Sequence, residues 1–365
     1  MTTACITALG AVTSVGLDAV TTCASIRAGL ARPAAIDEFQ VLDREAQAPV
    51  ALTGHPVALL TGGFAGVGRW LQLAAPALVD LCRAGKLPTS EDRRFWSTTA
   101  CVIVVPVLDP DRFGYDPACA DELALRTSLV APLRARVAGV FAPEQVDVLA
   151  TGRCGVLQAI VEAEQQLQAR QSGRVVILAV DSLLDDASLQ WLAGHGRLKQ
   201  DENPVGLMPG EGAVALLLES SDSARRRHAA PLARVTAVAT ASEPRAFLDG
   251  ERRHGEALAR SIGEALALAG TPPFAGAAIL DLNGEAWRAE EYGHARTRVP
   301  PATWDRGRIE LPAASVGDIG AGMTALQLAL ACRALARGHA DAPHVLCAAS
   351  DEYGSVGAAV LGKEE

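Results

Sequence analysis

Short apolar runs alternate along the chain with longer segments in which apolar residues recur at the helical period. The short runs are rich in valine, isoleucine and leucine, which favours buried strands of a mostly parallel sheet with helices on both faces. The predicted strands are Ala4–Leu9, Cys101–Val105, Val146–Ala150, Val175–Val180, Ala213–Leu218, Arg234–Ala239, Ala277–Leu282, His344–Ala349 and Ala358–Leu361. The predicted helices are Gly68–Arg83, Gly155–Arg170, Gly255–Ala269 and Gly322–Arg337. This alternation predicts an α/β protein.

The predicted elements repeat coarsely along the chain. A turn of small residues, a helix and a buried strand occupy 151–180 and again 315–349, and each copy is followed by a strand that begins with glycine. The segment Ser220–Pro231 lies between the copies, and its serines and arginines are typical of an exposed connector. We therefore predict two similar halves, residues 1–222 and 230–365.

Composition agrees with one large or duplicated α/β unit, because the 365 residues are 49% hydrophobic and no polar linker interrupts them. No stretch reaches the roughly 18 apolar residues of a membrane span, and the first residues lack the basic start of a signal peptide. We expect a cytoplasmic protein without a membrane partner. The eight cysteines form no Cys-x-x-Cys pair and have no histidine spacing typical of zinc, so we expect reduced core thiols and neither a metal nor a cofactor.

The formal net charge is −9, and an acidic chain argues against nucleic acid as the main partner. Basic residues cluster locally at 225–228 and at 252–254. Either cluster could meet an acidic carrier protein, but such runs are more often solvated loops and helix starts.

One decapeptide, Thr151–Ile160, reads T-G-R-C-G-V-L-Q-A-I. It resembles the nucleophile elbow of the β-ketoacyl synthases, the condensing enzymes of the thiolase superfamily, which typically reads T-A-C-A-S-G-L-Q-A-I. An ungapped overlay puts Arg153 at the position of the reactive cysteine and leaves Cys154 one residue late. A guanidinium stays protonated at physiological pH and has no lone pair for attack on a thioester. Arg153 therefore cannot act as the nucleophile.

Three further segments carry the resemblance from one end of the chain to the other. Ile6–Gly16 is similar to the family's opening I-T-G-L-G-A-V-T-P-L-G, Gly206–Ala213 to G-F-V-P-G-E-G-A, and Tyr353–Ala359 to the closing F-G-G-T-N-A. The resemblance implies a thiolase fold with two pseudo-duplicated halves in five α-β-α-β-α layers. It also implies a homodimer, with the elbow at the inner end of an acyl-pantetheine channel.

Two basic groups also assist condensation in this family, and both are histidines. The first histidine position, after a buried strand, falls on Asn283, which could still donate a hydrogen bond to a carbonyl. The second falls on Val316 without a gap or on Asp318 with a two-residue deletion. The nucleophile and both proton-handling groups are thus replaced, and each such loss costs orders of magnitude in rate.

The resemblance leaves two roles for Arg153. It either pairs with a buried carboxylate, for which Asp318, Asp351 and Glu352 are the candidates, or it points along the channel into solvent. The histidines His195 and His294 lie outside the family's motifs and are expected at the surface.

Two functional hypotheses follow. The first is a catalytically inactive ketosynthase-like protein that serves in binding or assembly. Its partner would be an active ketosynthase, as for a chain-length factor, an acyl carrier protein, or a bacterial secretion-system effector for which it is an adaptor or chaperone. The second is a β-ketoacyl synthase-type acyltransferase that uses Cys154 on acyl-carrier-protein or coenzyme A thioesters.

Overall fold

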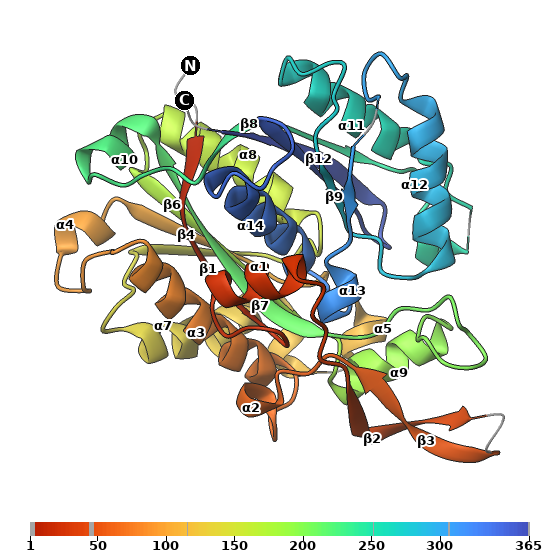
Figure 1. Ribbon diagram of the computed structural model, residues 1–365. Coiled ribbons are helices and arrows are strands. Elements are labelled where there is room, and N and C mark those ends of the chain that lie inside the picture. Colours follow the sequence, from red (N-terminus) through yellow and green to blue (C-terminus); the bar gives the residue numbers. More distant parts are fainter. Residues whose placement is uncertain (1–3, 44–46, 115, 251, 306, 364–365) are drawn as a thin grey trace.

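A ten-stranded sheet runs through the protein, for which a computed structural model describes residues 4–43, 47–114, 116–250, 252–305 and 307–363. Its strands are β1 (Ala4–Thr13), β4 (Thr99–Val104), β5 (Gln145–Leu149), β6 (Arg174–Ser182), β7 (Glu211–Ser220), β8 (Ala233–Ser242), β9 (Ala278–Leu280), β10 (Ile309–Glu310), β11 (His344–Ser350) and β12 (Ser355–Gly362). A separate antiparallel hairpin of β2 (Ala34–Asp43) and β3 (Ala48–Gly54) projects from the body (Figure 1).

The two ends of the large sheet repeat one topology. The strand order is β5-β4-β6-β7-β1 in the first five strands and β10-β9-β11-β12-β8 in the last five, so equivalent strands occupy equivalent places. In each set the first three strands are parallel to one another, and the remaining two neighbouring pairs are antiparallel. The two sets meet where Cys5 and Ile6 of β1 pair with Arg234 and Ala233 of β8. The chain is therefore pseudo-duplicated.

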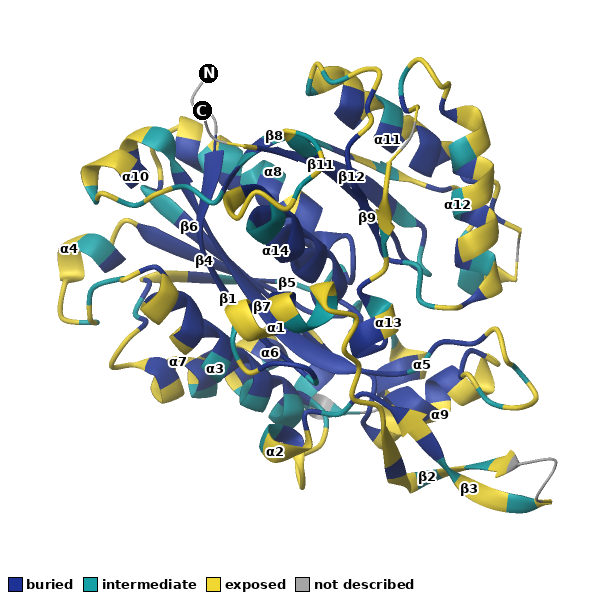
Figure 2. Cartoon of the chain, viewed as in Figure 1, coloured by how far each residue is buried: buried dark blue, intermediate teal, exposed yellow. Residues whose placement is uncertain are grey.

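Helices form three layers around these strands. They are α1 (Ala19–Arg27), α2 (Ala58–Thr61), α3 (Val67–Ala84), α4 (Arg93–Trp96), α5 (Pro110–Phe113), α6 (Glu122–Leu125), α7 (Ala131–Val137), α8 (Gly155–Gln168), α9 (Asp186–Gly194), α10 (Ser221–Arg226), α11 (Glu256–Leu268), α12 (Ala286–Arg298), α13 (Ala313–Val316) and α14 (Gly322–Ala336). Short helical turns lie at η1 (Pro117–Cys119), η2 (Arg126–Val130) and η3 (Phe247–Asp249). The buried helices α8 and α14 lie between the two sets of strands, and α11 and α12 cover an outer face (Figures 1 and 2).

Alternating burial along the strands explains the five layers. In β6, Val175, Ile177 and Ala179 pack toward α8 and α14, and the residues between them pack toward α3 on the other face. In β11, Val345 and Cys347 likewise face the central helices while their neighbours face α11 and α12. Strands buried on both faces must be apolar throughout, as the sequence pattern indicates.

All nine predicted strands and all four predicted helices occur, with ends shifted by a few residues. The sequence pattern missed the hairpin β2–β3, the two-residue β10, and helices such as α1, α7, α9 and α12. These elements are short, or they are exposed and carry many polar residues, so their apolar periodicity is weak.

The predicted connector and basic clusters need correction. Residues Ser221–Arg226 form α10, so the connector is partly helical. Arg227 turns inward and pairs with Glu219 at 2.5 Å, and Arg253 is buried against Glu291 at 2.8 Å. Neither cluster is therefore a continuous basic surface. All eight cysteines are buried, and no disulfide joins them.

Among the described residues, no helix combines the length and the apolar character that crossing a bilayer demands.

Candidate functional site

The elbow is a tight turn between β5 and α8. Gly152 has φ +67°, a conformation that favours glycine, and its N–H donates to the carbonyl of Val105 at 3.0 Å. A Cβ on Gly155 would lie only 2.2 Å from the hydroxyl oxygen of Thr151, so the first residue of α8 also needs glycine. This geometry places Arg153 just before the helix, where its side chain is 3% exposed.

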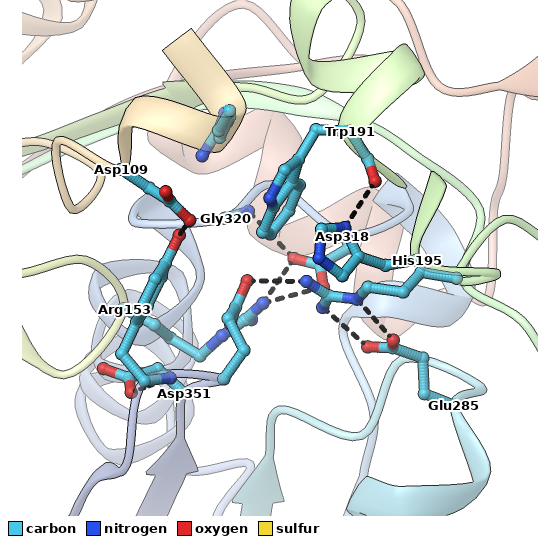
Figure 3. A network of polar contacts seen from close by, with 12 residues as sticks. Asp109, Arg153, Trp191, His195, Glu285, Asp318, Gly320 and Asp351 are labelled. Carbon is cyan, nitrogen blue, oxygen red and sulfur yellow. Dashed lines mark hydrogen bonds and ion pairs between the residues drawn. The ribbon is translucent and has the colours of Figure 1, made fainter. Parts of the chain in front are cut away.

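Arg153 pairs with the loop that leads into α14. Its Nη2 donates to both carboxylate oxygens of Asp318, at 2.8 and 2.7 Å (Figure 3). Its Nε lies 3.6 Å from a carboxylate oxygen of Asp281. Asp318 and Asp281 come from the second half of the chain, 165 and 128 residues after Arg153. The guanidinium therefore points into the protein and joins the two halves, and the alternative of a solvent-facing Arg153 is wrong.

The residues at the family's two histidine positions have different surroundings in this structure. The Nδ2 of Asn283 donates to Asp318 at 2.6 Å and to Glu285 at 2.8 Å, so its amide hydrogens are taken by carboxylates and are not free for a substrate carbonyl. Val316 is fully buried in the central core and lies outside the polar network. Asp318 is therefore the residue of this loop that reaches the elbow.

Two more arginines complete the buried network. Arg197 forms a two-pronged pair with Glu285, at 2.7 and 3.0 Å, and also reaches Glu352 at 2.9 Å. Arg288 contacts Asp281 at 3.0 Å and Glu352 at 3.2 Å. Of the three carboxylates proposed for Arg153, Asp318 binds it directly, Glu352 binds the other two arginines, and Asp351 binds none of the three through its side chain.

Three arginines thus face four carboxylates, and the pKa values reflect this balance. Burial acts to lower the pKa of Arg153, but the charges of Asp318 and Asp281 outweigh it and raise that pKa. Burial acts to raise the pKa of Asp318, but Arg153 outweighs it and lowers that pKa. The pair is therefore fully charged at neutral pH.

Asp351 is an additional buried carboxyl group beside the network. Its Oδ1 accepts hydrogen bonds from the N–H groups of Tyr353 and Ser355, at 3.0 and 2.9 Å, and its Oδ2 has no protein partner. Burial and the nearby charge of Glu352 raise its pKa to about 7. Asp351 is thus the group of this region that titrates near neutrality.

Little space is left at the elbow. The cavity beside Arg153, Asp318 and Asp351 has a volume of about 20 Å³. That is room for about one water molecule, which needs ~10–15 Å³, and far too little for an acyl chain or a pantetheine arm. In the described ranges, no group of three or more histidine, cysteine or acidic side chains is arranged to hold a metal ion.

Cys154 is 5% exposed and donates its S–H to the carbonyl of Ser355 at 3.3 Å. Burial, reinforced by the charge of Asp351, raises the pKa of this thiol well above its ordinary value. A reactive thiolate requires the opposite environment. The two histidines named from the sequence, His195 and His294, are exposed.

Sequence reasoning missed the arginines Arg197 and Arg288 and the carboxylate Glu285. Each of these residues has less than 5% of its surface exposed, and each lies in a loop or at a helix start that carried no family motif. The spacing of Glu285 and Arg288, three residues apart at the start of α12, was the available signal, because such residues share one face of a helix. Another missed residue is His55, which is buried with its Nδ1 unpartnered and whose pKa is lowered by burial.

Comparison with known proteins supports the fold. No family model matches the chain, and no curated protein matches its sequence. Among solved structures, a ketosynthase bound to its type II polyketide acyl-carrier protein superimposes with TM-score 0.76 at 15% identity, covering 99% of both chains. The ishigamide ketosynthase/chain length factor gives 0.76 at 18% identity, over 100% of this chain and 99% of the other. A β-ketoacyl synthase from Burkholderia phymatum gives 0.73 at 16% identity over the whole of both chains.

Full-length superposition, together with the repeated strand order, shows that this protein has the thiolase fold of the ketosynthases.

Proposed function

We propose that this protein is a non-condensing, ketosynthase-like binding or assembly partner, with its two halves at residues 1–222 and 230–365. The observation that carries the proposal is the Arg153–Asp318 pair at the elbow, which fills the place where a condensing enzyme needs a nucleophile and an acyl chain. A buried guanidinium held by two carboxylates supplies a link between the halves and no nucleophile.

The acyltransferase alternative requires Cys154 to form a thiolate beside an open channel. Its S–H instead donates to the Ser355 carbonyl, its pKa is raised, and the neighbouring cavity has about 20 Å³. These contacts favour the non-catalytic function.

Thiol labelling tests the choice between the two. The native protein is incubated at pH 7.5 with iodoacetamide, and separately with acetyl-coenzyme A, and peptides are analysed by mass spectrometry. We expect no adduct at Cys154 until the protein is unfolded, because the thiol is buried and protonated. Rapid labelling of native Cys154 that an acyl thioester blocks would overturn the proposal. The protein unfolded in urea is the matched control, since all eight cysteines should then react.

The partner that we propose is a second chain of the same fold, either another copy, which gives a homodimer, or an active ketosynthase, as for a chain-length factor. Two observations support it. The ten-stranded sheet ends at β5, which has one strand neighbour among the described residues, and an edge strand is a place where a second sheet can continue. A similar solved structure is titled a ketosynthase/chain length factor.

The oligomeric state tests this partner. Light scattering after size-exclusion chromatography should give twice the chain mass for the protein alone, or a complex when an active ketosynthase from the same genome is added. Asp147→Pro, in the middle of β5, should reduce the assembly because proline cannot donate to a strand pair. A protein that stays monomeric and binds no ketosynthase would contradict this partner. If it instead bound an acyl carrier protein, its function would be carrier binding, and if it bound a secreted effector, its function would be that of an adaptor.

A further inference from the structure

A basic cleft of about 400 Å³ lies at the end of α14 that is remote from the elbow. It is lined by Arg27 from the last turn of α1, by Arg333 from the last turn of α14, and by Arg337 and His339 just after that helix. Arg308, next to β10, closes one side. The helices α1 and α14 lie side by side here (Figure 1). Three separate segments of the chain therefore bring their basic side chains to one hollow.

Three of these arginines have no counter-charge. Arg308 is neutralised by Glu310 at 2.6 Å and by Asp341 at 3.7 Å. For Arg27, Arg333 and Arg337, by contrast, no carboxylate of the described residues lies within ion-pair distance. Arg333 lies in the last turn of α14 and Arg337 follows four residues later, directly after the helix, so their like charges repel. An unneutralised group of this kind in a chain of net charge −9 provides a local attraction for an anion.

Helix capping does not account for the arginines. At the end of α14, Gly338 has φ +68° and the N–H of His339 donates to the carbonyl of Ala334 at 2.8 Å. At the end of α1, the N–H of Leu30 donates to the carbonyl of Ser25 at 2.9 Å. Backbone groups thus satisfy the last carbonyls of both helices, as in ordinary glycine caps. The guanidinium donors remain free for another acceptor.

The chemistry of the lining restricts the ligand. Arginine offers several fixed N–H donors that match phosphate and carboxylate oxygens. The acidic group of the lining, Glu310, is already paired with Arg308. The remaining guanidinium donors would therefore be satisfied by a ligand with many hydrogen-bond acceptors. Among the described residues, the lining contains no phenylalanine, tyrosine or tryptophan. Three unpaired cations match two linked phosphate groups better than a single one.

From this juxtaposition we propose that the cleft between α1, α14 and β10 is a binding site for a small phosphate-bearing anion of the diphosphate class. The site is independent of the elbow and of the proposed pairing through β5. Its ligand would be held by Arg27, Arg333 and Arg337, with His339 at the rim.

Calorimetric titration with inorganic pyrophosphate, at fixed low ionic strength, tests the site. We expect saturable one-to-one binding that weakens as salt is added, because the contacts are ionic. Arg333→Gln with Arg337→Gln should lower the affinity at least about a hundredfold, since each lost charge-assisted hydrogen bond is worth about a factor of ten or more. Arg225→Gln with Arg226→Gln is the matched control, because it removes two arginines of α10 outside the cleft and should leave the affinity unchanged.

The absence of saturable binding to the unmodified protein would overturn the proposal. An equal loss of affinity in the control variant would overturn it too, because it would indicate general charge attraction. Citrate provides a comparison of similar charge without phosphate, and binding as tight as that of pyrophosphate would refute the phosphate assignment. Arg27→Gln, a single change on another helix, repeats the test if the double variant melts at a lower temperature than the unmodified protein.

Discussion

Arginines lie near both ends of α14, in opposite circumstances. At the start of the helix, Arg153 is buried and its guanidinium is matched by Asp318 and Asp281. At the end of the helix, Arg333 and Arg337 line an open cleft, and no carboxylate of the described residues lies within ion-pair distance of them. A buried cation is tolerated only with a partner, whereas a solvated one needs none. The difference separates arginines that hold the fold together from arginines that are free to bind a ligand.

The largest effect is expected at the buried end. Arg153→Met should lower the free energy of unfolding by about 3–5 kcal/mol, because it leaves the carboxylate of Asp318 buried without its cation. Urea denaturation followed by circular dichroism measures the change. The double variant Arg153→Met with Asp318→Asn should recover part of the loss, since it removes both charges.

The matched control for that experiment is Arg225→Met, whose side chain is 78% exposed. Its unfolding free energy should stay within about 0.5 kcal/mol of the unmodified protein. If Arg153→Met were as harmless as this control, the elbow arginine would not be a structural link.

The next effect depends on pH and concerns Asp351. Its pKa in the folded protein, about 7, is raised above the ordinary value of 3.8, so folding favours the protonated form. The resulting stability is complete below about pH 4 and is lost as the pH rises through 7. Asp351→Asn, which cannot ionise, should therefore be more stable than the unmodified protein at pH 8.

The gap between Asp351→Asn and the unmodified protein should shrink by about 1–3 kcal/mol between pH 8 and pH 5, at 1.36 kcal/mol for each unit of pKa shift. Thermal melts of both proteins across this range measure it. A gap that stays constant with pH would show that Asp351 is ionised throughout and that the network accommodates its charge.

The smallest effect is expected at the open end. Without a ligand, Arg333→Gln with Arg337→Gln should change stability by no more than about 0.5 kcal/mol, because lost repulsion between the arginines offsets lost attraction to the end of the helix. Melting temperatures check this. Pyrophosphate should raise the melting temperature of the unmodified protein and not that of the variant. A large loss of stability without ligand would place these arginines with the structural ones.

The contrast between the two ends also shows how far the sequence could predict the site. The position of Arg153 followed from one decapeptide, and Asp318 was among three candidate partners. The pairing of Arg197 with Glu285 was not predictable, because these residues are 88 residues apart in the chain. The basic cleft was missed for the same reason. The sequence instead indicated two runs of adjacent basic residues as candidate binding clusters. Arg227 and Arg253, which belong to these runs, form internal ion pairs.

The sequence by itself determined the alternation of buried strands and helices, the pseudo-duplication and the arginine at the elbow. These features depend on local periodicity and on short motifs, both of which involve residues that are close together in the sequence. Only the tertiary structure decided which charges meet. Ion pairing depends on which loops converge at the ends of the strands and helices, and the loops that meet at the elbow and at the cleft come from segments far apart in the chain. Burial then makes pairing obligatory at one end of α14, while exposure leaves the other end open to an anion.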